Sequence, residues 1–147
     1  MYEDVLEHRV SEPDFRPVTM PAIPQIRMTR RIAGVTTPDA SQSHRHVDGS
    51  IGMVGDWRRR GPVYEIPFGA LYGRAVGNLI TAGRCISVTD SMWDITRVIP
   101  VCAVTGEAAG CAAAMTDDFR RLEVRALQRK LIEKGIVLHE EELKKTV

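Results

Sequence analysis

The segment from residue 81 to residue 106 has residue types and spacing that could bind an electron-rich ligand. TAGRCIS at 81–87 closes an apolar run, and TRVIPVCAVTGEAAGCAAAM, from residue 96, has the composition of a helix over 98–115. The first N–H groups of a helix lack intrahelical partners and lie at the positive end of its dipole, so they favour electron-rich oxygens. A strand end, a loop and a helix start in this order predict a ligand crevice of the α/β type.

Small residues on the predicted helix indicate that something approaches it closely. Ala103, Gly106, Gly110 and Ala113 are three to four residues apart and therefore share one face. Each interior glycine costs roughly 1 kcal/mol of helix propensity relative to alanine, so close approach must bring an offsetting benefit. The neighbour could be a strand, another helix or a flat ligand, and plain helix-on-sheet packing is the simplest interpretation.

His44 and His46 form a second group with chemical potential, in the polar loop SHRHVDGS. Their spacing places both rings on one side only if the backbone is extended. A metal site would need a third ligand, which the sequence does not identify, so no metal site is predicted. A solvated surface loop and an acid–base catalyst remain as interpretations, because imidazole exchanges protons near neutral pH.

Charged and aromatic residues elsewhere allow weaker hypotheses. The arginines at 58–60 are typical of a solvated face, and the alternative is an anchor for a substrate carboxylate or for an acidic partner. Trp93 lies in the predicted loop 85–97, where it either stacks on a ring or fills the core.

The pattern along the chain divides it into four segments. Residues 1–24 are predicted to be an extended, proline-rich connector whose first ten residues resemble the end of a helix, and residues 139–147 a polar tail. Residues 25–76 are strand-rich, and residues 77–138 contain one apolar strand followed by helices. The fold class is therefore predicted to be α/β.

Individual elements follow from the same pattern. Strands are predicted over 25–35, 51–57 and 63–73 and, most clearly, over 77–83, which is apolar enough for a buried parallel position. Two helices are predicted after the loop, the first over 98–115. The second begins near Thr116 or Asp117 and stops at Gly135.

Composition excludes several classes of protein. A net charge of +1 and an aromatic content of 5% argue against nucleic acid as a partner. The polar N-terminus is unlike a signal peptide, and the longest apolar stretch, 98–115, is typical of a buried helix more than of a membrane span. Cys85, Cys102 and Cys111 lack zinc-type spacing, so we expect reduced thiols in a cytoplasmic protein.

Four motifs together carry a family resemblance. They are YEIPFGAL (64–71), NLITAGRCIS (78–87), Arg97 and GEAAGCAA (106–113). In this order they resemble the C-terminal part of FAD-dependent oxidoreductases of the glutathione-reductase-like superfamily, closest to a bacterial group that ends in YxIPxxxL … NLxxAGRxIS … R … GxAAGxAAA. The resemblance covers roughly residues 24 to 138. It implies the last strand and C-terminal helices of a Rossmann-like FAD-binding domain, with strands of a substrate-binding region.

The resemblance also implies which residues contact FAD. The residues after the strand lie beside the ribityl or pyrophosphate region, those at the helix start reach the isoalloxazine, and a glycine lets the helix pack closely. These are Gly83, Arg84, Cys85, Arg97, Val98, Ile99 and Gly106. Reduction places negative charge on the N1 and O2 side of the ring, which backbone N–H groups would stabilise.

The resemblance also implies a role for Arg97 at the flavin or at the substrate. If the protein is such an enzyme, His44 or His46 is a candidate base by its chemistry, removing a hydroxyl proton while a small organic substrate passes a hydride to flavin N5.

One motif of the family is absent from these residues, and its absence leads us to expect a partner chain. The dinucleotide fingerprint GxGxxG, followed by an acidic residue, does not occur in the 147 residues. The ADP half of FAD would then be held by a second chain that carries GxGxxG, and this chain would be a fragment or small subunit of the oxidoreductase. The alternative is a non-catalytic, truncated protein that self-associates or binds a partner through the uncovered surface.

Overall fold

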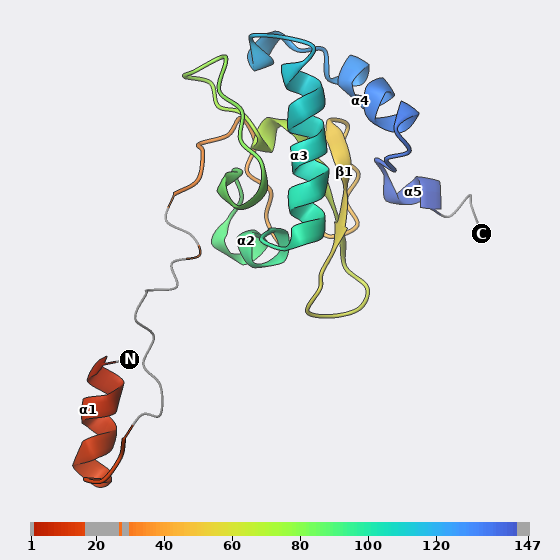
Figure 1. The fold of residues 1–147 in the computed structure, drawn as a ribbon. Helices are drawn as coiled ribbons and strands as arrows, with labels where there is room; N and C mark the ends of the chain where they lie inside the picture. Colours follow the sequence, from red (N-terminus) through yellow and green to blue (C-terminus); the bar gives the residue numbers. More distant parts are fainter. Residues whose placement is uncertain (1, 17–26, 28–29, 144–147) are drawn as a thin grey trace.

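A computed structural model describes residues 2–16, 27 and 30–143 of the chain. In Figure 1 helix α3 runs beside strand β1, and α2 and α4 lie near its two ends. The helices and strands are α1 (Tyr2–Ser11), β1 (Ser50–Gly55), β2 (Val63–Pro67), α2 (Asp90–Thr96), α3 (Ile99–Ala113), α4 (Val124–Glu133) and α5 (Glu140–Leu143). Short 3₁₀ helices interrupt the connections: η1 (Phe68–Ala70), η2 (Gly83–Cys85) and η3 (Phe119–Arg121).

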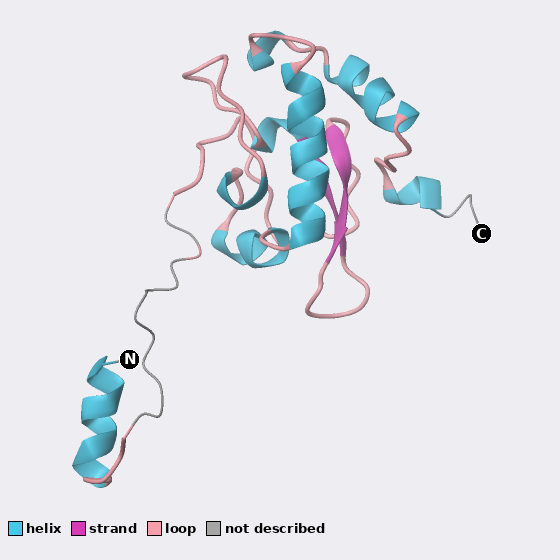
Figure 2. Cartoon of the chain, in the orientation of Figure 1, coloured by secondary structure: helices cyan, strands magenta, loops and turns pink. Residues whose placement is uncertain are grey.

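Strands β1 and β2 form an antiparallel hairpin, drawn in magenta in Figure 2. Ser50 pairs with Pro67 and Val54 with Tyr64, and the register shifts between Ser50 and Met53. Gly52 sits at this irregularity with φ 146°, and a Cβ added there would lie 2.6 Å from Cγ1 of Val104. The close approach between hairpin and helix therefore depends on a glycine of the strand. The first strand agrees with the prediction over 51–57. The second begins at Val63 as predicted but ends at Pro67, and η1 replaces the strand expected to continue to residue 73.

Helix α3 is the central helix of the core. Its buried side chains recur every three to four residues and are Val101, Thr105, Ala108, Ala109 and Ala112. This face packs on β1, η2 and α4. Apolar residues of the hairpin and of the following turns, such as Ile51, Ile66 and Phe68, complete the core. The predicted helix is confirmed, with Pro100 in its first turn as expected.

The second predicted helix is shorter than expected. Leu122 and Glu123 have extended backbone angles, so the segment divides into η3 and α4. The Asp118 carboxylate accepts the Arg120 N–H at 3.1 Å and caps η3. Gly135, with φ 83°, ends the turn after α4 as predicted. Leu127 and Leu131 bury the apolar face of α4.

The predicted loop 85–97 contains helix α2, which the sequence analysis missed. Thr89 precedes it in extended conformation, and its hydroxyl oxygen accepts the Met92 N–H at 3.4 Å. Met92, Ile95 and Thr96 are buried. A Thr followed by Asp90 is an N-terminal helix signal, but α2 has only seven residues and too little periodicity to detect.

The prediction of a buried parallel strand over 77–83 is wrong. Ile80 makes an isolated antiparallel bridge to Tyr72, and Leu79 is 48% exposed. Gly83 already belongs to η2. The described residues hold one two-stranded antiparallel sheet, so this apolar run has no parallel neighbour with which to pair.

The N-terminal predictions are tested only in part. Residues 2–11 are helical, in agreement with the helix end expected there. Pro17, Pro21 and Pro24 lie outside the described residues, as do residues 25, 26, 28 and 29 of the predicted strand 25–35. In the described remainder of that segment no strand is present, and Gly34 forms an isolated bridge to Gly73.

The described chain combines helices with a small sheet, which agrees with the α/β class predicted. By length and composition no single described helix is able to cross a membrane, whereas α2 and α3 would do so only as a pair bent by 93°.

Candidate functional site

The turn η2 is fastened to the second turn of α3. The Gly83 N–H donates to the Thr105 hydroxyl at 2.9 Å, and this hydroxyl in turn donates to the Val101 carbonyl at 2.8 Å. Gly83 has φ 68°, and a Cβ added there would lie 3.2 Å from the Cys102 sulfur. Only glycine combines this left-handed backbone with such close contact to the helix. The structure thus brings the Ala-Gly-Arg turn and the start of α3 together, as the sequence predicted.

The N-terminus of α3 has no side-chain cap. Val98 is the N-cap residue, and its side chain cannot accept a hydrogen bond. Ile99 is 85% exposed. The first turn of an α-helix leaves N–H groups without intrahelical partners, so the exposed Ile99 offers a backbone donor at this end of the 15-residue helix, whereas Pro100 has no N–H and Val101 is buried.

Arginine side chains surround this helix end. The Arg84 Nε donates to the Arg97 carbonyl at 3.2 Å, so η2 and the residue before the N-cap are linked. The Cys85 thiol is exposed and donates to the Ala82 carbonyl at 3.3 Å. Gly83, Arg84, Cys85, Arg97, Val98 and Ile99 therefore lie around one junction, where η2 meets α3.

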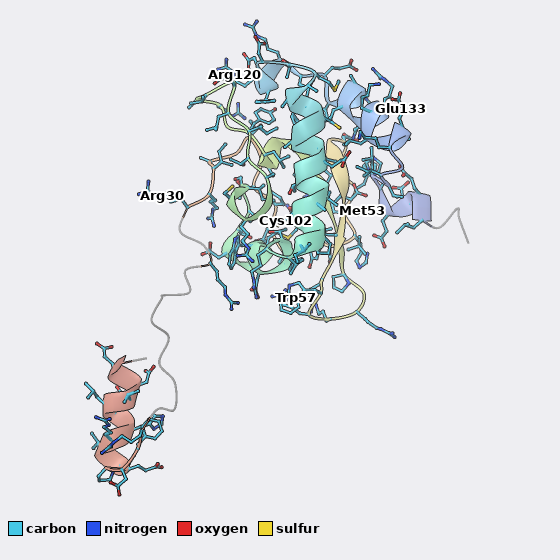
Figure 3. All side chains as sticks on the ribbon, in the orientation of Figure 1. Arg30, Met53, Trp57, Cys102, Arg120 and Glu133 are labelled. Atoms are coloured by element: carbon cyan, nitrogen blue, oxygen red, sulfur yellow. The ribbon has the colours of Figure 1, made fainter. Side chains whose placement is uncertain are left out.

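Arg97 is held in one orientation by three neighbours. Its Nε donates to the Asp94 carboxylate at 3.0 Å. Its guanidinium carbon lies 5.4 Å from the ring centroid of Trp57 and 5.6 Å from that of Trp93. Cation–π contact and the ion pair together restrict the side chain. Trp57 lies in the loop between β1 and β2 (Figure 3), so this loop reaches the site.

The Asp94 carboxylate is shared by two arginines. Arg58 Nη1 donates to it at 3.0 Å, while Nε and Nη2 of the same side chain donate to the Asp56 carboxylate. The pKa of Asp94 lies below its ordinary value, mainly because of the hydrogen bond from Arg97, with burial opposing it. The hydrogen bond from Arg58 likewise lowers the pKa of Asp56 to about 2. The arginines at 58–60 are exposed, as expected of a solvated face, but Arg58 also belongs to an ion-pair network that holds Arg97.

Tryptophan side chains attach this network to the backbone. The Trp57 indole N–H donates to the Asp94 carbonyl at 2.9 Å, and the Trp93 indole N–H donates to the Arg84 carbonyl at 3.1 Å. Sequence reasoning missed Trp57 and Asp94 as partners of Arg97 and Asp56 as a partner of Arg58. The Asp-Trp-Arg sequence at 56–58 was visible, but only the fold places Trp57 and Arg58 against Asp94 of α2.

Gly106 and its neighbours on α3 face away from the core. Gly106 and Gly110 are exposed, and a Cβ added to either would meet no atom within 4 Å in the described part of the chain. Ala103 and Ala113 are exposed on the same face. We call these four residues the small-residue face of α3. The expectation that Gly106 allows close packing is therefore wrong within this chain, where Gly52 and Gly83 have that role instead.

His44 and His46 lie in a different part of the fold, beside the segment that leads into α5. The His44 imidazole contacts Glu140 at 2.9 Å. His46 contacts Asp48 at 3.3 Å and Glu141 at 3.5 Å. His44 also has φ 59°, the only described non-glycine residue with a positive φ. These contacts join the histidines to carboxylates and not to the η2–α3 junction, so nothing in them supports the predicted role as base at the flavin.

In this α/β protein, a helix N-terminus without a side-chain cap lies beside two arginines, which is an arrangement suited to an electron-rich ligand. Comparison with known families identifies the class of protein: residues 5–131 match the family described as FAD dependent oxidoreductase. The match spans most of the chain, which therefore belongs to this family, and FAD is the family's cofactor. No curated protein and no solved structure matched the sequence.

The residues at the junction fit the cofactor. An isoalloxazine offers carbonyl oxygens and ring nitrogens, which require donors and, on reduction, positive potential. The junction offers backbone N–H groups at an uncapped helix end and two guanidinium groups, with an exposed apolar Ile99 next to them. The donor set is thus complementary to the ring side of FAD.

Proposed function

We propose that this chain forms the flavin-ring side of the FAD site in an oxidoreductase whose substrate is a small organic molecule. When bound, FAD supplies a hydride acceptor at N5 and gathers negative charge at N1 and O2. The observation that carries the proposal is the uncapped, exposed N-terminus of α3 beside Arg84 and Arg97. FAD family membership agrees with it.

Each part of the junction has a distinct task in this proposal. Backbone N–H groups near Val98 and Ile99 donate to the polar edge of the ring. The Arg97 guanidinium adds positive charge close to that edge, and Asp94, Trp57 and Trp93 fix its position before the ligand arrives. Such preorganised charge stabilises a reduced ring without further rearrangement.

A second polypeptide completes the cofactor site. These 147 residues lack the GxGxxG fingerprint that holds the pyrophosphate, and in this proposal a chain that carries it binds the ADP half of FAD. The small-residue face of α3 is the surface that packs on this chain. Two exposed glycines lower helix propensity by roughly 1 kcal/mol each relative to alanine. Close packing of this face on a partner chain would offset that loss.

The test is to purify the tagged chain from its native host and to analyse the complex. The expected result is a yellow complex that contains FAD and a polypeptide with GxGxxG. A colourless homo-oligomer would contradict the proposal and favour a non-catalytic, self-associating protein.

Arg97→Ala in that complex tests the role of the arginine. We expect turnover to fall by roughly 10²-fold, the usual loss when one preorganised donor is removed. Arg121→Ala is the matched control, because Arg121 is 85% exposed in its side chain and pairs only loosely with Asp118 at 3.6 Å. Equal turnover in the two variants would show that Arg97 has no role at the flavin.

A further inference from the structure

Three side chains from distant parts of the sequence converge outside the flavin site. His46, Glu65 and His139 offer one ligand atom each, and these atoms all lie within 4.8 Å of one another. His46 belongs to the loop before β1, Glu65 to β2, and His139 directly precedes α5. The sequence identified no third ligand for a metal at His46. The fold supplies one, because it brings Glu65 and His139 next to His46.

Glu65 is the most buried and most firmly held side chain of this cluster. Its side chain is only 5% exposed. Oε2 accepts the Val47 N–H at 2.7 Å and faces His139 Nδ1 at 2.9 Å, and Oε1 accepts the Glu140 N–H at 3.2 Å. A carboxylate has about four lone-pair positions, so the two backbone hydrogen bonds leave Glu65 able to bind a cation once the proton between Glu65 and His139 is released. A buried carboxylate placed in this way is a ready oxygen ligand.

The two imidazoles lie against each other. Their ring centroids are 4.4 Å apart and the planes are inclined by 19°. A metal lies close to the plane of each imidazole that binds it, so the exposed His46 ring turns out of this stack when both histidines bind one cation. A neutral imidazole is the form that binds metals.

Further acidic groups surround the cluster. Asp48 and Glu141 contact the His46 ring at 3.3 and 3.5 Å, and Glu140 contacts His44. A cavity of about 240 Å³, lined by His44, His46, Glu65, Glu140 and Glu141, gives access to two of the three ligands. The surrounding negative charge attracts a cation, and a neighbouring carboxylate or a water can complete four-coordination.

We propose that His46, Glu65 and His139 bind a zinc-type divalent cation that ties the α5 segment to the hairpin. In tetrahedral zinc sites with bonds of about 2.0–2.1 Å, ligand atoms lie about 3.3 Å apart, so the three groups close inward by up to about 1.5 Å on binding. His46 is on an exposed loop and makes most of this movement. Imidazole ligands select zinc-type cations over magnesium or calcium, which prefer oxygen alone. The cation is structural and takes no part in flavin chemistry.

Zinc titration tests this proposal in a Cys85→Ser background, which removes the exposed thiol as a competing ligand. We expect saturable binding of one Zn²⁺ per chain by calorimetry, with a higher thermal midpoint at saturation. Co²⁺ should give the visible absorption of a tetrahedral nitrogen and oxygen site, and Mg²⁺ should not bind. Absence of saturable Zn²⁺ binding, or equal binding of Mg²⁺, overturns the proposal.

Two histidine variants provide the matched comparison. His46→Ala removes a ligand that is 47% exposed, and His44→Ala removes a neighbour that is 50% exposed and outside the ligand set. Both variants are surface changes that leave the core intact. We expect His46→Ala to lose at least about tenfold in Zn²⁺ affinity and His44→Ala to stay within about threefold of the parent. Equal losses in the two variants would contradict the assignment of His46. Because the readout is metal affinity, the result is independent of flavin binding.

Discussion

Arg97 owes its fixed position to a chain of charges that alternates in sign. Arg97 and Arg58 share Asp94, and Arg58 also pairs with the buried carboxylate of Asp56. One arginine alone at the surface would move among rotamers and lose entropy on binding a ligand. The network removes that freedom in advance. At the residue scale, the sequence identified Arg97 by its place in a motif, but part of the network that holds it, residues 56–58, comes from 39 to 41 positions earlier in the chain.

Acid stability provides a measurement of this network. The folded pKa of Asp56 is about 2, below its ordinary value of 3.8, so its ionised form is favoured by folding. That contribution is fully present above the ordinary value and is lost as the pH falls towards 2. We expect Asp56→Asn to be less stable than the parent at pH 6 in urea unfolding. The difference should shrink as the pH falls from about 4 to about 2.

Asp90→Asn is the control for that series, because Asp90 pairs with Arg31 but is 83% exposed in its side chain. An exposed pair contributes little, so the control should follow the parent at every pH. A pH-independent difference between parent and Asp56→Asn would show that the carboxylate stabilises only through shape and neutral hydrogen bonds.

At the scale of elements, the sequence predicted helix α3 correctly but not which of its faces makes the close contacts. The glycines of α3 were visible as a spaced pair, and the helix itself was predicted. Their exposure was not predictable, because the opposite face, with Ala108, Ala109 and Ala112, has an equally small pattern. The strand predicted over 77–83 failed for a related reason, since an apolar run does not state whether a neighbour exists to pair with it.

Alanine substitutions distinguish the two kinds of glycine. Gly106→Ala places its Cβ in open space, so we expect the isolated chain to be stabilised by roughly 0.5–1 kcal/mol in urea unfolding. Gly83→Ala forces a left-handed residue against the Cys102 sulfur, and a loss of roughly 1–2 kcal/mol is expected. If Gly106→Ala were destabilising by a similar amount, its face would be packed against something in the isolated protein.

At the scale of the whole molecule, the described residues leave one side of the central helix α3 uncovered. The α/β class and the FAD family were predictable from sequence, because short motifs with fixed spacing can be recognised without knowing how the strands pair. The small antiparallel sheet, the helix α2 and the cluster at Glu65 were not, since each depends on contacts between distant segments. The uncovered side carries Ile99, Ala103 and both exposed glycines on one helix.

A charged residue introduced on the uncovered side of α3 should affect assembly with the second chain but not folding of this chain. Ala103→Glu places a carboxylate at an exposed position of α3, so the urea midpoint of the isolated chain should change by no more than roughly 0.5 kcal/mol. If this face packs on the chain that binds the ADP half of FAD, burial of an unpaired charge abolishes the yellow complex. Ile132→Glu, at a 54% exposed position of α4, is the control and should leave the complex intact. Recovery of the complete complex with Ala103→Glu would place the contact with the second chain on another surface.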